Sequence, residues 1–289
     1  MMAPMQGRVP RMTNRYRYAA AAWLLSLVGA PGAAWAQDKP LWELGLGAGV
    51  LRAPDYRGSA NHTTYVAPIP YLIYRGRHVQ VDREGVHGDL LKTERTKASW
   101  SLAAGVPAKS RADGARAGMP DLDPTVEVGP SLEIFLHRNT ASDHEWSLRL
   151  PLRAVIATDL RHSQGVGWVF APHLHLNARR LGGGWEGSLG VGPLYASEAY
   201  HDYYYEVAPA YATATRPQYD AQDGYSGSRV TLTLTRRFDG YWIGAFARYD
   251  TLAGAAFADS PLVQKKESFM IGVGVAWVFA QSGTRVNAP

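Results

Sequence analysis

The most constraining feature of the sequence is an alternating run near its end, Ser268 to Phe279, which reads SFMIGVGVAWVF. One face of this run is apolar throughout and carries Phe269, Ile271, Val273, Val275, Trp277 and Phe279. The other face carries Met270 and otherwise only small residues, Gly272, Gly274 and Ala276. A strand of a soluble sandwich would show polar side chains on its outer face. An apolar face opposite a nearly bare one is typical of a strand between lipid and the lumen of a barrel.

The same alternation recurs along most of the chain. Further runs begin at Trp42, Thr63, Trp100, Val126, Trp146, Trp168, Trp185, Val230 and Tyr241. Several of them place Glu, Arg, His or Asn opposite the apolar face, which a water-facing lumen explains and a packed sandwich core does not. Most tryptophans lie near strand ends, as the aromatic girdles of a membrane barrel require. The alternative is the ordinary enrichment of aromatic residues in strands.

The amino terminus predicts export from the cytoplasm. Residues 1–36 combine four arginines without an acidic residue, a short apolar core from Ala19 to Val28, and Ala34-Trp35-Ala36 as a cleavage site. These are the parts of a secretory signal peptide, and the apolar core is too short to span a bilayer. Without the four signal arginines the net charge falls from +5 to +1, so the basic pI does not indicate nucleic-acid binding. The chain has no cysteine, which excludes disulfides and thiolate chemistry.

Loop lengths predict the number of strands. Counted back from Phe279, long loops at 251–267, 207–224, 110–123 and 52–62 fall at one end of the barrel, and short turns at 180–184 and 238–240 fall at the other. This count gives about twelve strands if residues 76–91 form two strands, which the loop at 52–62 requires, but these two would be short for spanning a bilayer, so ten strands or a bent hairpin are the alternatives. Pro68 and Pro70 imply a kinked or poorly paired strand. The run from Trp185 predicts a strand through Tyr195, with a continuation through Tyr205 as the alternative.

The predicted fold is therefore an all-β, antiparallel transmembrane β-barrel in the outer membrane. The barrel is expected to span residues 37–280, after a signal peptide at 1–36 and before a tail at 281–289. We expect a monomer that contacts outer-membrane lipid and binds neither a nucleic acid nor a cofactor.

Several stretches resemble an outer-membrane family that includes the MltA-interacting protein MipA and OmpV. They are Gly47-Ala48-Gly49, Pro54 to Ser59, Pro68-Ile69-Pro70, Tyr203 to Pro209 with Tyr219-Asp220, and Asp259-Ser260-Pro261. The resemblance implies a barrel that is not an enzyme and that holds a lytic transglycosylase near a murein synthase in the periplasm. It supplies no catalytic residues. The chain departs from the family in two places. Glu206 stands where the family tends to have glycine, and a tail follows Phe279, whereas family members usually stop at an aromatic residue.

Six polar residues are candidates for lining the lumen: Glu127, Glu133, Arg149, Arg153, His173 and His175. Glu127 and Glu133 share the inner face of one predicted strand, and Arg149 and Arg153 share that of its neighbour. Charge pairing that fills a narrow lumen is the preferred interpretation, and anion selectivity of a small pore is the alternative. His173 and His175 could ligate a metal with Glu133, but two histidines are too few ligands alone, so we predict no metal.

The candidate binding surface is the aromatic segment Tyr200, His201, Asp202, Tyr203, Tyr204 and Tyr205, which we expect in a loop. Tyrosine offers a large contact area at low entropic cost, although an aromatic girdle at a strand end would have the same composition. A hydrolase would need a serine bonded to a histidine, and the adjacency of His162 and Ser163 does not provide that bond. We therefore expect a non-enzymatic scaffold for peptidoglycan-remodelling enzymes, with a narrow diffusion channel for small solutes as the alternative.

Overall fold

The structure is a computed structural model that describes residues 38–76, 79–82, 85–111, 113–138, 143–159 and 161–287. The predicted signal peptide lies outside these residues. The described strands up to the midpoint of the chain are β1 (Asp38–Pro40), β2 (Trp42–Pro54), β3 (His62–Arg75), β4 (Val79–Asp82), β5 (Gly85–Lys92), β6 (Thr96–Gly105), β7 (Thr125–Arg138) and β8 (His144–Thr158). The later elements are β9 (Ser163–Phe170), β10 (His173–Ala178), β11 (Trp185–Ala196), the helix α1 (Glu198–Tyr205), a 3₁₀ turn at Pro209–Tyr211, β12 (Gly224–Arg237), β13 (Tyr241–Thr251), β14 (Glu267–Gln281) and β15 (Arg285–Asn287).

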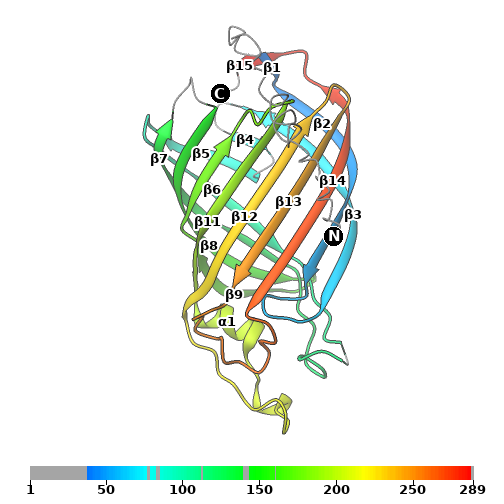
Figure 1. Ribbon diagram of the computed structural model, residues 1–289, viewed down its shortest axis with the longest axis vertical. Helices are drawn as coiled ribbons and strands as arrows, with labels where there is room; N and C mark the ends of the chain where they lie inside the picture. Colours follow the sequence, from blue (N-terminus) through cyan, green and yellow to red (C-terminus); the bar gives the residue numbers. More distant parts are fainter. Residues whose placement is uncertain are drawn as a thin grey trace, which may run out of the picture. The chain divides into compact units, whose positions relative to one another are not determined.

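Residues 42–281 form one antiparallel sheet that closes on itself, as the sequence predicts (Figure 1). The last long strand, β14, pairs with the first, β2, and β8 pairs with both β9 and β10. Because β9 and β10 also share β11 as their other neighbour, they occupy one strand position that is interrupted at Ala171 and Pro172. The thirteen strands of the described sheet therefore fill twelve positions around the barrel.

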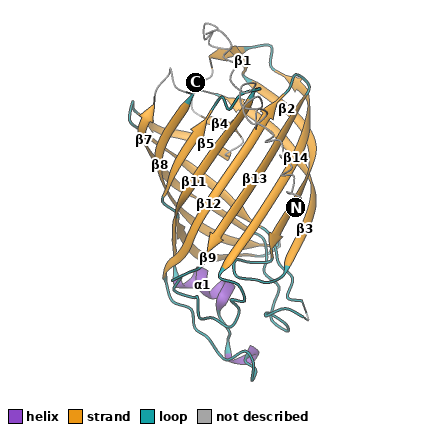
Figure 2. Cartoon of the chain, in the orientation of Figure 1, coloured by secondary structure: helices purple, strands orange, loops and turns teal. Residues whose placement is uncertain are grey.

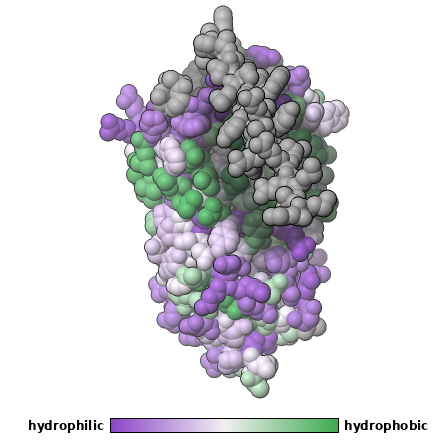
Figure 3. All heavy atoms as spheres, in the orientation of Figure 1, coloured by the Kyte–Doolittle hydropathy of each residue, from purple (hydrophilic) through white to green (hydrophobic). Residues whose placement is uncertain are grey.

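The two faces of the wall differ as predicted. In β14, Phe269, Ile271, Val273, Val275 and Trp277 are all exposed on the outer face. The small residues between them are buried because inward side chains of other strands lie over them: a Cβ atom at Gly272 would meet Phe246, and one at Gly274 would meet Ile69. Glycine on the inner face of β14 thus makes room for large inward-pointing side chains of other strands. Figure 3 shows hydrophobic residues gathered over the strands and a more hydrophilic lower end.

The region at 76–91 forms two short strands, β4 and β5, rather than one bent hairpin strand. β3 pairs with β2 over thirteen consecutive positions despite Pro68 and Pro70. On its other side, the described part of β3 pairs with β4 only at Tyr74 and Arg75. The prolines are therefore tolerated in a strand whose second edge is mostly unpaired, where a missing N–H has little cost.

Two segments differ from the prediction. The chain from Glu198 to Tyr205 is a helix and not a loop or a continued strand (Figure 2). Residues 285–287 of the predicted tail form β15, which pairs with β1 in a separate two-stranded sheet. Among the described residues no helix has the length and apolar character to cross a membrane.

Candidate functional site

One end of the barrel is closed by a folded cap, which we define as α1 together with the loops 55–61, 106–124, 206–223 and 252–266. In Figure 1 the cap lies at the lower end and the β1–β15 sheet at the upper end. Buried side chains from all of these segments form one apolar cluster: Tyr56, Ala108, Leu122, Tyr205, Val207, Ala221, Leu252, Ala255, Phe257 and Leu262. The cap therefore has a hydrophobic core of its own at this end of the barrel.

The centre of the cap is the contact between Tyr205 and Phe257. Their rings stack with centroids 3.6 Å apart at an interplanar angle of 8°. The Tyr205 hydroxyl donates to the Arg57 carbonyl at 2.9 Å, and the Tyr205 carbonyl accepts from Ser260 Oγ at 2.7 Å. Tyr56 donates to the Leu262 carbonyl at 2.7 Å. Three of the five stretches that carry the family resemblance, those at Pro54–Ser59, Tyr203–Pro209 and Asp259–Pro261, thus meet in this core.

The predicted binding segment 200–205 forms most of α1. Ser197 caps the helix by accepting from the Tyr200 amide at 3.3 Å. His201 and Tyr205 point into the cap core and are 0% and 1% exposed, so they cannot contact a partner at the surface as predicted. His201 and Tyr205 are four residues apart, so the helical period of 3.6 places them on the same buried face of α1. Tyr200, Asp202, Tyr203 and Tyr204 are partly buried.

The environment of His201 favours the neutral imidazole. Its Nδ1 is hydrogen-bonded to the Gln222 carbonyl, its ring packs on Phe257 with centroids 4.6 Å apart, and its Nε2 is buried without a hydrogen-bond partner among the described residues. Burial lowers the pKa of His201, and the positive charge of Arg57 acts in the same direction. A neutral histidine thus forms part of the cap core.

The six lumen candidates lie on the inner faces of β7, β8 and β10. Arg149 Nε lies 2.8 Å from Glu133, and Arg153 Nε lies 2.8 Å from Glu127. Both ion pairs join the neighbouring strands β7 and β8 and do not cross the lumen. Glu133 also accepts from Ser147 Oγ at 2.8 Å, and Arg153 donates to Ser101 Oγ at 3.2 Å. Such pairing satisfies charges that the wall buries.

The histidine candidates lie side by side on β10. The rings of His173 and His175 are 6.0 Å apart in an edge-to-face arrangement, and His173 Nδ1 is bonded to the Ala171 carbonyl at 2.9 Å. Glu133, their proposed third ligand, is engaged by Arg149 and Ser147. The Ser163 hydroxyl donates to Thr158 Oγ1 at 3.0 Å rather than to His162.

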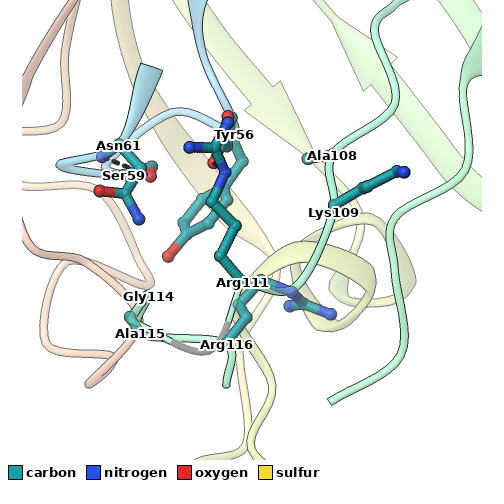
Figure 4. A pocket seen from close by; sticks show the side chains of 10 residues that line it. Tyr56, Ser59, Asn61, Ala108, Lys109, Arg111, Gly114, Ala115 and Arg116 are labelled. Atoms are coloured by element: carbon teal, nitrogen blue, oxygen red, sulfur yellow. Dashed lines mark hydrogen bonds and ion pairs between the residues drawn. The ribbon is translucent and has the colours of Figure 1, made fainter. Parts of the chain in front are cut away.

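Two small features of the cap were not anticipated from the sequence. Carboxylates of Glu198, Asp202 and Asp220 lie within 4.8 Å of one another at the cap surface, and burial together with these acidic neighbours raises the pKa of Asp202. Their convergence could not be foreseen because the sequence predicted a loop instead of α1 and does not show how the loop at 207–224 folds against it. The second feature is a cavity of about 10 Å³ between the loops 55–61 and 106–124, beside Tyr56 and Arg116 (Figure 4). It has room for about one water molecule.

The opposite end of the barrel carries many basic residues, which we call the terminal rim. It comprises Lys39, Arg75, Arg95, Lys97, Arg138, Arg179, Arg180, Arg236, Arg237 and Arg285. Acidic residues bind some of them: Glu43 accepts from Arg75 at 2.8 Å and from Arg237 at 2.9 Å. Arg95 and Arg180 are exposed at the short turns of this end. Glu145 also pairs with Arg138 and Arg179, and Asp143 pairs with Arg180, so the positive charge of the rim is partly balanced.

Comparison with known proteins shows which family has this sequence pattern. The family model described as MltA-interacting protein MipA matches residues 46–279, which covers every strand from β2 to β14 in whole or in part. The chain belongs to the MipA family. It is 28% identical over 255 residues to the MltA-interacting protein of Escherichia coli strain K12, covering 86% of this chain and 93% of that protein. The MltA-interacting protein of Shigella flexneri matches to the same extent.

Solved structures that match the chain include the following two. The translocator domain of the autotransporter NalP from Neisseria meningitidis has a TM-score of 0.43 at 9% identity, covering 82% of this chain and 88% of that one. An outer membrane channel from Pseudomonas putida F1 has a TM-score of 0.44 at 9% identity, covering 84% and 97%. On the match of the family model, the chain is an outer-membrane β-barrel of the MipA family, and the outer face of its wall exposes large apolar side chains such as Leu46, Val273 and Trp277.

Proposed function

We propose that this barrel is a non-enzymatic scaffold that binds a peptidoglycan-remodelling enzyme, a lytic transglycosylase of the MltA type, in the periplasm. The observation that carries the proposal is the match of the MipA family model to residues 46–279. The curated relatives in this family are named for their interaction with MltA. The capped end agrees with such a role, because a scaffold does not need an open passage through the membrane.

The terminal rim is the proposed contact surface. Chain ends and short turns of bacterial barrels lie in the periplasm. The end of the barrel that carries the terminal rim also carries β1, β15 and the short turns at 179–184 and 238–240. A peptidoglycan enzyme would therefore meet the positive charge of the terminal rim. Electrostatic complementarity then calls for an acidic patch on the partner.

A binding experiment with matched charge reversals tests the proposal. The full chain is purified from outer membranes in detergent, and its affinity for a purified MltA-type lytic transglycosylase of the same organism is measured by surface plasmon resonance. The scaffold predicts saturable binding, weakened about tenfold by Arg95→Glu with Arg180→Glu. Arg161→Glu, at an exposed position on the capped side, is the control and should leave the affinity unchanged.

Absence of binding by the unmodified chain, under conditions where the E. coli MltA-interacting protein binds its enzyme, would contradict the scaffold. Equal loss of affinity in the Arg161 control would show that the terminal rim is not the contact surface. The alternative function, a narrow diffusion channel, would require a path past Tyr205, Leu252 and Phe257, all of which are buried in the cap.

A further inference from the structure

Three arginines meet a single carboxylate where the cap joins the barrel wall. Asp250, near the capped end of β13, is 2% exposed. Its Oδ1 lies 2.7 Å from Arg229 Nε on β12 and 3.9 Å from an Nη atom of Arg57, and its Oδ2 lies 3.3 Å from Arg248 Nε. We call Arg57, Arg229 and Arg248 the arginine cluster.

The arginine cluster has hydrogen-bond donors to spare. Both Nη atoms of Arg57 donate to Ser226, at 2.7 Å to its carbonyl and 2.6 Å to its hydroxyl. Arg229 donates to Asp250 through Nε, whereas Arg248 Nε is buried without a hydrogen-bond partner among the described residues. The Nη atoms of both arginines have no hydrogen-bond partner there either. Their side chains are 27% and 25% exposed, and both project from the inner face of the wall. Several guanidinium N–H groups therefore face the lumen unused.

Positive charge is in excess at this position. Three guanidinium groups surround one carboxylate, which leaves two positive charges uncompensated in a largely buried site. Elsewhere on the wall, Arg149 has Glu133 and Arg153 has Glu127. Unpaired buried charge is costly, so an arrangement of this kind is stable only if a further anion completes it or water reaches it.

A neutral hydroxyl group from the cap lies in the same electrostatic environment. Burial raises the pKa of Tyr200 on α1, although the charges of Arg57, Arg229 and Arg248 act in the opposite direction. The phenol thus stays protonated and can donate a hydrogen bond beside the cluster.

We propose that the arginine cluster binds a small dianionic oxyanion, such as phosphate, in the lumen beneath the cap. A dianion neutralises the two excess charges, and the planar guanidinium fork matches the oxygens of a phosphate or sulfate group. The cap closes the near end, so the anion enters from the end that carries the terminal rim. This site is independent of the proposed scaffold function and uses none of the residues assigned to it.

Thermal unfolding at constant ionic strength tests the site. The full chain is heated in detergent while phosphate replaces chloride, and unfolding is followed by tryptophan fluorescence. We expect the Tm to rise saturably with phosphate, and calorimetric titration to give a single site. Arg248→Gln and Arg229→Gln should each weaken phosphate binding about tenfold, which corresponds to about 1.4 kcal/mol. In chloride these two variants should unfold at a higher temperature than the unmodified chain, because like-charge repulsion is removed.

Asp250→Asn supplies a test of opposite sign. Without the carboxylate, the net positive charge of the arginine cluster rises by one, so phosphate should bind more tightly and raise the Tm further. In chloride, the same variant should have a lower Tm than the unmodified chain. Arg149→Gln is the control in the same lumen: it should lose stability because the ion pair between Arg149 and Glu133 is lost, but keep the phosphate response. Equal stabilisation of all variants by phosphate and sulfate would reflect a general salt effect and overturn the proposal. No phosphate-dependent shift in the unmodified chain would overturn it as well.

Discussion

At the scale of single residues, the lumen is organised by ion pairs between neighbouring strands. The sequence predicted which residues take part, because strict alternation assigns Glu127 and Glu133 to one inner face and Arg149 and Arg153 to the next. It could not predict the partner of each residue. Glu133 lies directly opposite Arg149, whereas Arg153 reaches Glu127 diagonally, since Val155 is the residue opposite Glu127. Register at this level depends on bulges such as the one between Phe135 and His137.

The pair of Glu127 and Arg153 allows a direct measurement of this residue-scale account. Arg153→Gln would leave Glu127 unpaired with its side chain 15% exposed. We expect the free energy of unfolding, measured by urea titration in detergent, to fall by about 3 kcal/mol. The double variant Glu127→Gln with Arg153→Gln should recover most of this loss. A double variant as unstable as the sum of the two single variants would show that the pair is not coupled.

At the scale of elements, the strands were predictable and the helix was not. Each of the long strands repeats a period of two over ten or more residues, as in β2, β8 and β14, which is a strong signal. α1 has eight residues and is rich in tyrosine, which favours strands, so local preference pointed the wrong way. The available signal was Ser197 before Glu198, a serine cap followed by an acidic residue in the first turn. The helix is held by contacts with Phe257 and Leu262, far along the chain, which no local pattern reveals.

The packing of α1 predicts that truncating Phe257 opens the cap. Phe257 is fully buried against Tyr205, so Phe257→Ala should cost the cap about 3–5 kcal/mol. We expect the loops 206–223 and 252–266 to become cleavable by protease in intact outer membranes while the strands stay resistant. Leu232→Ala, at an exposed position on the outer face of β12, is the control and should leave the loops protected. Loops that are equally resistant in both variants would argue against a single cap core.

Burial of His201 predicts that the cap weakens in acid. Its folded-state pKa lies below the unfolded value of about 6.5, so the unfolded cap binds more protons between these two values. The stability of the cap should therefore be complete above about pH 6.5 and decrease as the pH falls towards the depressed pKa. Arg57 and Asp223 are the charged groups that act on the ring, in opposite directions.

The measurement is protease protection of the cap loops between pH 7.5 and 5. His201→Gln should remove the dependence in this range, and His162→Gln, whose side chain is 90% exposed, should retain it. Protection that falls with pH to the same extent in the His201 variant would place the sensitive group elsewhere.

At the scale of the whole molecule, the sequence predicted a closed barrel and the end at which its long loops gather. Both follow from the alternation and from loop lengths, which are local quantities. The cap did not follow, because its core combines Tyr56 and Phe257 from two loops with Tyr205 from α1, three segments that are separate in the sequence. The chain thus has a wall with an apolar outer face, a cap at one end and the terminal rim at the other. In the scaffold proposal, the terminal rim is the surface that binds the partner enzyme.

Conductance in planar bilayers tests the central claim, a barrel closed at one end, most directly. Full-length chain purified from outer membranes and inserted into the bilayer should give no steady current, because the cap core blocks one mouth. Phe257→Ala should introduce current through the loosened cap, which shows that silent molecules are inserted. Steady steps from the unmodified chain that scale with salt, and that change ion selectivity with Arg153→Glu, would contradict the closed barrel and identify a diffusion channel.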